Sequence, residues 1–211
     1  MFNKNNISGL SHTTKEELTY AVNKLKPNNA LSNLTEYFLK AEKNYDINAV
    51  ILLSIACLES NYGLSKLAVE KNNLFGIDAR DSLQGKPSYG KDFETKEACI
   101  DHAGHRLGMQ YLKRDSKADW RYCGGKQDIY SIGKKWCSKD TWADSVISVA
   151  NRIEKAIEDY RGRETVDYKR KYEDLKSKVK ALIKELENEV KWFKFNLRDC
   201  GSYNNSLCRI L

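Results

Sequence analysis

The chain has 211 residues, 41% of them hydrophobic and 31% charged, with only two prolines and twelve glycines, which fits a globular helical protein and disfavours a β-sandwich. No apolar run approaches the length of a membrane span, and the N-terminal residues lack the hydrophobic core of a secretory signal. The net charge of +7 favours anionic partners such as nucleic acid, anionic lipid or bacterial wall polymers, and does not choose among them.

Helical spacing of apolar residues recurs along most of the chain and predicts a mainly α fold. We expect a loose N-terminal arm over residues 1–12, a main domain over 13–160 and a basic helical tail over 161–211. Thr14 and Glu17 form a capping-box pattern at the first helix, and Asp46 is expected to cap the third. In chain order, the expected helices cover about 14–25, 34–43, 49–59, 66–71, 95–113, 126–136 and 141–160, with an irregular loop or short hairpin over 76–94.

Residues 49–59 form an almost uninterrupted apolar segment that ends in one carboxylate, Glu59. Such a helix has no polar face, so we expect it inside the protein, with Gly63 as its stop. Apolar surroundings and the negative end of the helix dipole both disfavour a charged carboxylate, so the pKa of Glu59 is expected to rise. A carboxylic acid that keeps its proton near neutral pH can act as a general acid.

After Gly162 the pattern becomes that of a coiled-coil seam. Apolar residues step by four, three, four, three and four through Tyr168, Tyr172, Leu175, Val179, Leu182 and Leu186. Residues 161–211 hold 13 basic and 8 acidic residues, so most of the net positive charge lies in this tail. The pattern favours a helix that self-associates through residues 168–193 to form a homo-oligomer. A single helix that packs back on the main domain is the alternative.

Other site chemistries find weaker support in the sequence. Cys99, His102 and His105 step by three along one expected helix and drift around it, so packing is favoured over a metal site, and no cofactor is expected. No nucleic-acid site is expected, because the charges of the tail alternate in sign and its aromatic residues have seam spacing. The six cysteines include no C-x-x-C pair, so free thiols are expected, with a pairing of Cys200 and Cys208 left open.

The loop after the buried helix carries further candidates for chemistry. Glycoside hydrolysis needs one protonated acid and one ionised carboxylate across the scissile bond. Asp78, Asp81, Asp92 and Glu94 lie in this loop, and Asp78 or Asp81 is expected opposite Glu59. Aromatic side chains that could stack on sugar rings are Tyr62, Tyr89, Trp136 and Trp142.

Four stretches of the main domain stand out as motifs: FLKAEKNYDINA (38–49), CLESNYG (57–63), NNLFGI (72–77) and IGKKWCSKDTWA (132–143). In this order they resemble the glucosaminidase domain of glycoside hydrolase family 73, seen in bacterial autolysins and phage wall-degrading enzymes. The resemblance covers residues 13–158. It departs from the family at the closing motif, where Trp136 and Cys137 stand in the region that usually has Tyr, so the phenol hydroxyl is missing.

The resemblance implies a lysozyme-like helical fold with a short loop or hairpin lobe. It also implies cleavage of the peptidoglycan glycan strand, usually after N-acetylglucosamine, with Glu59 as the general acid and Asp81 as an acidic residue of the site. The second catalytic group stays open among the acidic residues of the loop. The substrate-binding residues expected on this basis are Asn61, Tyr62, Asn73, Phe75, Asp78, Tyr89, Trp136 and Trp142.

We therefore expect a peptidoglycan endo-β-N-acetylglucosaminidase whose partner is the bacterial wall. With no signal peptide visible, we expect a phage lysin that stays in the host cytoplasm until its release to the wall, or a virion-associated enzyme. Two alternatives stay open: an N-acetylmuramidase that cuts the other bond of the same polymer, and a catalytically weakened wall-binding or structural protein, which the altered motif at Trp136 favours.

Overall fold

The computed structural model describes residues 3–79, 81–86, 88–112 and 127–200, without the side chains of Asp81 and residues 196–200. The chain divides into two compact units, Met1–Arg161 and Gly162–Leu211, and each is described here by itself. Among the helices described, none combines the length and the apolar content needed to cross a bilayer. Cys57, Cys99 and Cys137 are free thiols, whereas Cys123, Cys200 and Cys208 lie outside the described side chains.

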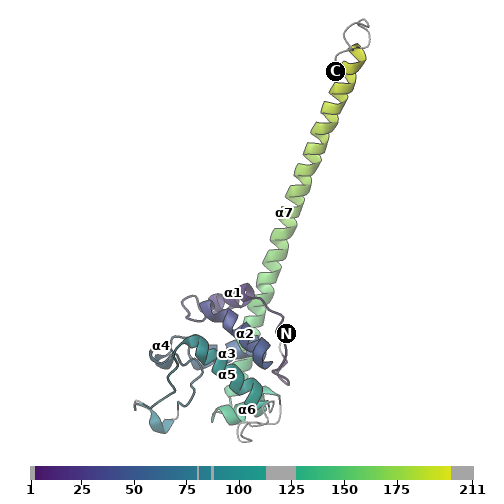
Figure 1. Ribbon diagram of the computed structural model, residues 1–211. Helices are drawn as coiled ribbons and strands as arrows, with labels where there is room; N and C mark the ends of the chain where they lie inside the picture. Colours follow the sequence, from purple (N-terminus) through teal and green to yellow (C-terminus); the bar gives the residue numbers. More distant parts are fainter. Residues whose placement is uncertain (1–2, 80, 87, 113–126, 201–211) are drawn as a thin grey trace. The chain divides into compact units, whose positions relative to one another are not determined.

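The described part of the first unit is built from helices and connecting loops (Figure 1). Its helices are α1 (Lys15–Leu25), η1 (Ser32–Leu34), α2 (Thr35–Tyr45), α3 (Ala49–Glu59), α4 (Lys66–Glu70), η2 (Asp81–Leu83), α5 (Lys96–His105), η3 (Arg106–Tyr111), α6 (Ile129–Trp136) and the first part of α7 (Trp142–Cys200). Within the described ranges, extended pairing is limited to isolated bridges, Asn3 with Asn6 and Ser8 with Ile47. The mainly α fold predicted from the sequence is therefore confirmed.

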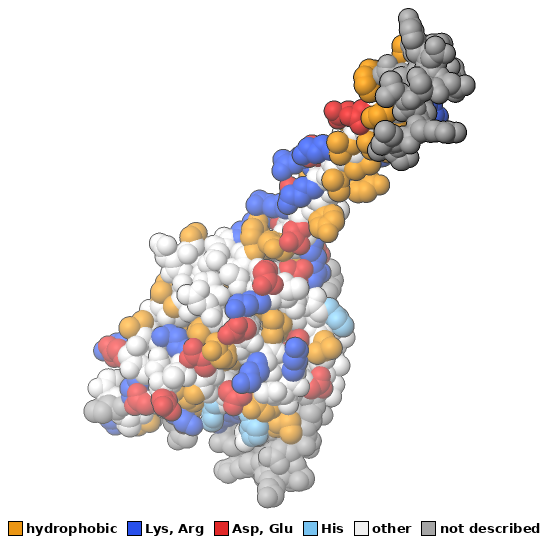
Figure 2. Space-filling view, turned by 45° about the horizontal axis from the view of Figure 1, so that its top comes forward, with side chains coloured by type: hydrophobic (Ala, Val, Ile, Leu, Met, Phe, Trp, Pro, Cys, Tyr) orange, Lys and Arg blue, Asp and Glu red, His pale blue; other side chains and the backbone are white. Residues whose placement is uncertain are grey.

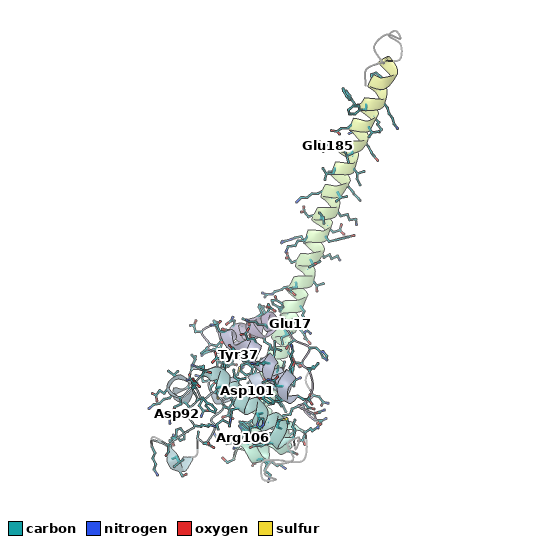
Figure 3. The ribbon with its side chains drawn as sticks, viewed as in Figure 1. Glu17, Tyr37, Asp92, Asp101, Arg106 and Glu185 are labelled. Carbon is teal, nitrogen blue, oxygen red and sulfur yellow. The ribbon has the colours of Figure 1, made fainter. Side chains whose placement is uncertain are left out.

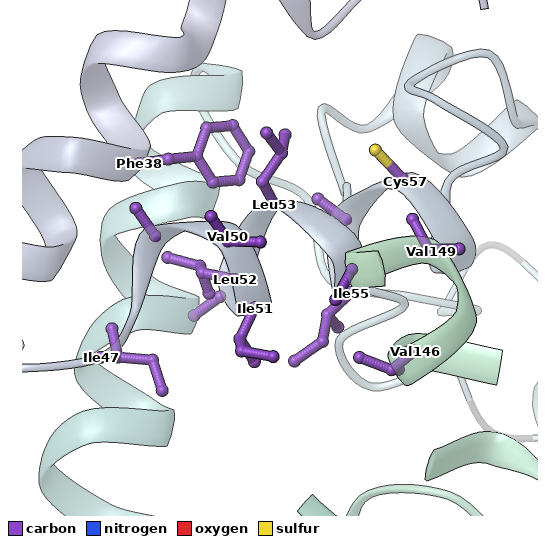
Figure 4. Close-up of a cluster of buried hydrophobic side chains, with 14 of the residues drawn as sticks. Phe38, Ile47, Val50, Ile51, Leu52, Leu53, Ile55, Cys57, Val146 and Val149 are labelled. Atoms are coloured by element: carbon purple, nitrogen blue, oxygen red, sulfur yellow. The ribbon is translucent and has the colours of Figure 1, made fainter. Parts of the chain in front are cut away.

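Helix α3 lies in the core of the first unit, as predicted from its apolar sequence. All nine residues from Ala49 to Cys57 are buried. Figure 4 shows Phe38 of α2 near Val50 and Leu53 of α3. Val146 and Val149 of α7 lie near the C-terminal part of α3, which contains Ile55. Because helices on several sides fix α3 in place, they also fix the residue that follows it, Glu59.

The start of α3 differs from the prediction, because Asn48 and not Asp46 caps it. Asp46 ends α2 in a left-handed conformation, with φ 52°, and its carboxylate accepts a hydrogen bond from the Gly9 N–H at 2.9 Å. The chain needs these residues to turn between the two helices, so the capping position moves to Asn48. Its side-chain oxygen accepts hydrogen bonds from the N–H groups of Val50 and Ile51, at 3.0 and 3.3 Å.

The segment before α1, expected to be a loose arm, packs against the first unit. Ile7 is completely buried, its N–H donates to the Gln127 carbonyl and its carbonyl accepts from the Asn48 N–H, both at 2.9 Å. The buried carboxylate of Glu42 accepts from the Ser11 N–H at 2.6 Å. One apolar anchor and these long-range hydrogen bonds order the segment, and neither is visible as a periodic pattern in a polar stretch of sequence.

An ion pair joins the two ends of the first unit. Thr14 and Glu17 form the predicted capping box at α1. The Arg161 guanidinium donates to both carboxylate oxygens of Glu17, at 2.5 and 2.9 Å, and to the His12 carbonyl at 2.9 Å. This guanidinium lowers the pKa of Glu17, which is labelled in Figure 3. The first unit therefore ends at a residue that is tied back to its first helix.

The helix predicted over residues 95–113 changes its winding part of the way along. Thr95 caps α5 as expected, and the chain continues into η3, a π-helical segment. Gly108 of η3 lies so close to α2 that a Cβ there would be 2.1 Å from the Tyr45 carbonyl oxygen. Only glycine permits this approach, and a π-helical turn is a local change of geometry that apolar spacing does not encode.

The described part of the second unit is one helix, residues 162–200 of α7. The side chains that are described, residues 163–195, are almost all exposed, including those of the predicted seam. The long C-terminal helix expected from the sequence is confirmed.

Candidate active site

Glu59 is the last residue of α3 and stands where the core meets a loop. Ser60 behind it is completely buried, and its hydroxyl donates to the Ala56 carbonyl and accepts from the Gly63 N–H. Asn61 and Tyr62 then take positive φ angles of 48° and 61°. The helix thus ends four residues before Gly63, the predicted stop, and the chain turns away sharply, which leaves the Glu59 carboxyl half-buried at the helix end.

Two tryptophans, one from α6 and one from α7, contact the carboxyl of Glu59. The indole N–H of Trp142, a buried residue at the start of α7, donates to Glu59 Oε1 at 2.6 Å. Trp136, at the end of α6, stacks on Trp142 with ring centroids 6.2 Å apart, and Tyr111 packs on Trp136 at 5.6 Å. These contacts fix the carboxyl in one orientation against an aromatic wall.

Burial raises the pKa of Glu59, in the direction that the sequence predicted. The N–H groups of Trp142 and Trp136 favour the charged form, as does the positive charge of Lys139, and these effects are too small to cancel the loss of solvent. Trp136 thus brings a second N–H donor to the acid. The carboxyl holds its proton to a higher pH than a free glutamate does.

Gly76 faces the other oxygen of this carboxyl. Its φ is +61°, and a Cβ at this position would lie 3.6 Å from Glu59 Oε2. Gly76 and Trp136 also line a cavity of about 240 Å³, whose other walls are Phe75, Ile77, Asp78, Ala79, Arg106, Tyr111 and Lys135. Glu59 does not line this cavity itself. Gly76 and Trp136 both contact its carboxyl and both line the cavity, so the carboxyl lies at the cavity edge.

The cavity brings charged groups of both signs next to the aromatic wall. Asp78 is exposed, with a φ of +57°, and is the described carboxylate that lines the cavity. Arg106, labelled in Figure 3, and Lys135 supply positive charge. Sequence reasoning missed Arg106, Tyr111 and Lys135, although Lys135 directly precedes Trp136 in the closing motif.

The π-helical segment explains how Arg106 and Tyr111 come to line the same cavity. In an α-helix, residues five apart point about 140° away from each other. In a π-helix the hydrogen bonds run from residue i to i+5, so residues at that spacing lie nearly above one another. Arg106 and Tyr111 are the first and last residues of η3, and both reach the cavity.

Asn73 is buried in the loop and holds it together. It is 1% exposed, and its amide N–H group donates to the carbonyls of Ile77 and Lys91 at 2.9 and 3.0 Å. Its side-chain oxygen accepts from the N–H groups of Ile77 and Phe75 at 3.0 and 3.4 Å. This geometry favours a structural role for Asn73 over the predicted contact with a glycan.

The remaining predicted site residues lie in several places. Phe75 is 1% exposed and lines the cavity beside Gly76. Asn61 is exposed, whereas Tyr62 is half-buried and its hydroxyl lies near the charge of Arg152. Tyr89 lines a different cavity, of about 590 Å³, together with residues of α4. Asn61, Tyr62 and Tyr89 do not line the cavity at Gly76, so their contact with substrate stays a prediction.

The acidic residues of the loop do not all approach Glu59. Asp81 begins η2, and its side chain lies outside the described residues. Asp92, labelled in Figure 3, pairs with Lys71 at 3.4 Å, and Glu94 is exposed. Hydrogen bonds from Gly90 to Asp78 and from Lys91 to Ile77 close the base of the loop.

Cys99, His102 and His105, the possible metal ligands in the sequence, each contact a different residue. The Cys99 sulfur accepts a hydrogen bond from the Leu74 N–H at 3.3 Å. The rings of His102 and His105 pack edge-on against Phe93 and Tyr45. Within the described ranges, no group of three or more His, Cys, Asp or Glu residues is placed to hold a metal ion.

Sequence comparison matches most of the chain. The family model described as mannosyl-glycoprotein endo-beta-N-acetylglucosaminidase matches residues 35–203. Two curated proteins from strains of Streptococcus pneumoniae, both described as putative endo-beta-N-acetylglucosaminidase, are 32% identical over 143 residues. The match covers 67% of this chain and 20% and 19% of those proteins. The chain thus spans about a fifth of the length of the curated relatives it matches.

Two solved structures of S. aureus autolysin E have a similar fold. A catalytic mutant in complex with the disaccharide NAG-NAM aligns with a TM-score of 0.51, and a complex with the muropeptide NAM-L-Ala-D-iGlu aligns with 0.50. Each is 19% identical, and each alignment covers 74% of this chain and 71% of the other. At this identity the likeness shows the fold alone, and it supports the helical fold that the sequence predicted.

Proposed function

Because this chain belongs to the glucosaminidase family, we propose that it hydrolyses the glycan strand of bacterial peptidoglycan as an endo-β-N-acetylglucosaminidase, with Glu59 as the general acid. The observation that carries the proposal is the carboxyl of Glu59, whose pKa is raised and which Trp142 holds at the edge of a cavity. The names of the curated relatives and the ligands of autolysin E support the same polymer.

In the proposed reaction, Glu59 gives its proton to the glycosidic oxygen as the bond to the anomeric carbon breaks. Water adds to that carbon and returns a proton to the Glu59 carboxylate, which restores the acid. Asp78, on the cavity wall, is the described carboxylate best placed to stabilise the developing positive charge. Asp81 stays a predicted alternative for this role.

The bond that is cut can be read from the products. Purified peptidoglycan is digested and the new reducing ends are identified by mass spectrometry. The proposal predicts N-acetylglucosamine at the new reducing end. N-acetylmuramic acid there would identify a muramidase, and binding to the wall without release of fragments would identify a wall-binding protein. The assignment to a phage lysin or a virion, and the predicted location, rest on the sequence alone and stay predictions.

Replacing Trp142 by Phe is expected to move the alkaline limb of the pH–rate profile to higher pH. The indole N–H favours charged Glu59, so its loss raises the pKa further and the acid stays protonated to higher pH. The measurement is kcat/KM on soluble glycan fragments across pH. Trp192→Phe, in the exposed tail, is the matched control and should leave the profile unchanged. A limb that stays in place in Trp142→Phe contradicts the assignment.

Replacing Gly76 by Ala is expected to lower kcat/KM by about tenfold or more, because the methyl group takes up space that the substrate needs beside the acid, and a small displacement of reacting groups can cost about 10²-fold. The substitution strains a backbone with φ +61° and places a methyl group 3.6 Å from Glu59 Oε2. Gly85→Ala is the control, since Gly85 has φ +81° with nothing within 4 Å, so it carries similar backbone strain with no methyl group beside the acid. Equal losses in the two variants would remove the argument for Gly76.

A further inference from the structure

The helix of the second unit carries an uncovered apolar seam. We define the seam as Tyr168, Tyr172, Leu175, Val179, Leu182, Leu186 and Phe193. Every one of these side chains is exposed, from 46% at Val179 to 80% at Tyr168. Figure 2 shows hydrophobic side chains gathered along this helix. A helix gains free energy when it buries such a stripe against a partner.

The spacing of the seam indicates what kind of partner fits it. The steps from Tyr168 to Leu186 alternate between four and three, and Phe193 follows seven residues later. This average of 3.5 residues is the repeat of a left-handed coiled coil, in which each helix must carry the same repeat. A second copy of residues 168–193 carries the same repeat, and Glu189 is the one seam position in this segment that is not apolar.

We propose that residues 168–193 bind the same segment of a second copy of this chain in antiparallel orientation. Full overlap of the two segments centres the pair between Lys180 and Ala181. The layers then join Val179 to the partner's Leu182, Leu175 to the partner's Leu186 and Tyr168 to the partner's Phe193. Between the last two of these layers, Tyr172 meets the partner's Glu189. Such a dimer carries two copies of the first unit, which, with the function proposed above, raises its avidity for a polymeric ligand.

Charges beside the seam select the antiparallel orientation. In an antiparallel pair, Lys178 lies next to the partner's Glu185, and the two-fold symmetry makes this ion pair twice. Glu185 is labelled in Figure 3 and is exposed on α7. In a parallel pair, Lys171 would meet the partner's Lys176, and Glu189 would meet the partner's Glu189 in the seam. Opposite charges face each other in the first case and like charges in the second.

The test is a charge-swap cycle in the full chain, with the dimer Kd measured by sedimentation equilibrium in the presence of reductant. Lys178→Glu and Glu185→Lys are each expected to weaken the dimer by about three- to tenfold, and the double variant is expected to recover most of the loss. The two residues are two helical turns apart, so their coupling reports the contact between chains and not one within the helix.

Lys180→Glu, Glu187→Lys and their double variant form the matched control, because these residues have the same spacing of seven and lie away from the seam. The Kd of these variants should stay within about twofold of the parent, as expected for exposed charges with no partner across an interface. A monomeric full chain, or no coupling between positions 178 and 185, overturns the proposal. A dimer tightened by Lys171→Glu would instead indicate the parallel orientation and overturn it as well.

Discussion

Replacing Glu59 by Gln is expected to lower the rate of glycan cleavage by about 10²- to 10⁴-fold, the range that a general acid contributes. Gln keeps the shape of the side chain and can still accept the hydrogen bond from Trp142, but it has no proton to give. Release of reducing ends from purified wall measures the rate. Glu70→Gln, an exposed residue of α4, is the control and should keep full activity. Substantial cleavage by Glu59→Gln would contradict the assignment.

Thermal unfolding of the same variant separates lost chemistry from lost structure. Because the folded state raises the pKa of Glu59, folding is favoured by the protonated carboxyl and opposed by the charged one. This stabilising effect of the proton is present at low pH and is lost as the pH rises through the raised pKa. Gln cannot ionise, so Glu59→Gln should be at least as stable as the parent, with an advantage that grows toward alkaline pH.

Replacing Asn73 by Ala is expected to lower the free energy of unfolding by about 3 to 5 kcal/mol. The change removes four hydrogen bonds inside a buried loop and leaves backbone groups without partners, each of which costs about 1 to 3 kcal/mol. For a protein of this size, we expect the midpoint of thermal unfolding to fall by about 10 °C. Circular dichroism measures both the midpoint and the helical content.

Asn44→Ala provides the comparison for this variant. Asn44 is exposed near the end of α2, where Ala is a better helix former, so the stability should hold or rise slightly. If Asn73→Ala matches this control in stability and loses only activity, Asn73 contacts the substrate, and the structural role is wrong.

The sequence predicted the parts of the site that local patterns encode. The apolar run of α3 indicated a buried helix, and the position of Glu59 at its end indicated a raised pKa, because both depend on neighbours in sequence. The capping residues Thr14 and Thr95 were found for the same reason. Asp46 was misassigned because two capping residues stand within three positions, and only the turn geometry decides between Asp46 and Asn48.

The partners of Glu59 could not be read from local patterns. Trp142 donates to it from 83 residues further along the chain, and it was predicted only as a surface for sugar stacking. Arg106 and Tyr111 share a cavity because η3 is π-helical, which no spacing of apolar residues indicates. The motif NNLFGI also identified Asn73, but it did not indicate which backbone groups form hydrogen bonds with the amide of Asn73.

The titration of the Glu59 carboxyl tests the central claim most directly. Carbon NMR of labelled protein follows this one carboxyl across pH, and Glu59→Gln identifies its signal by the loss of it. The structure predicts a midpoint above that of a glutamate free in solution, and a further increase in Trp142→Phe. A midpoint at or below the value of free glutamate would contradict the role of Glu59 as the acid that stays protonated for catalysis.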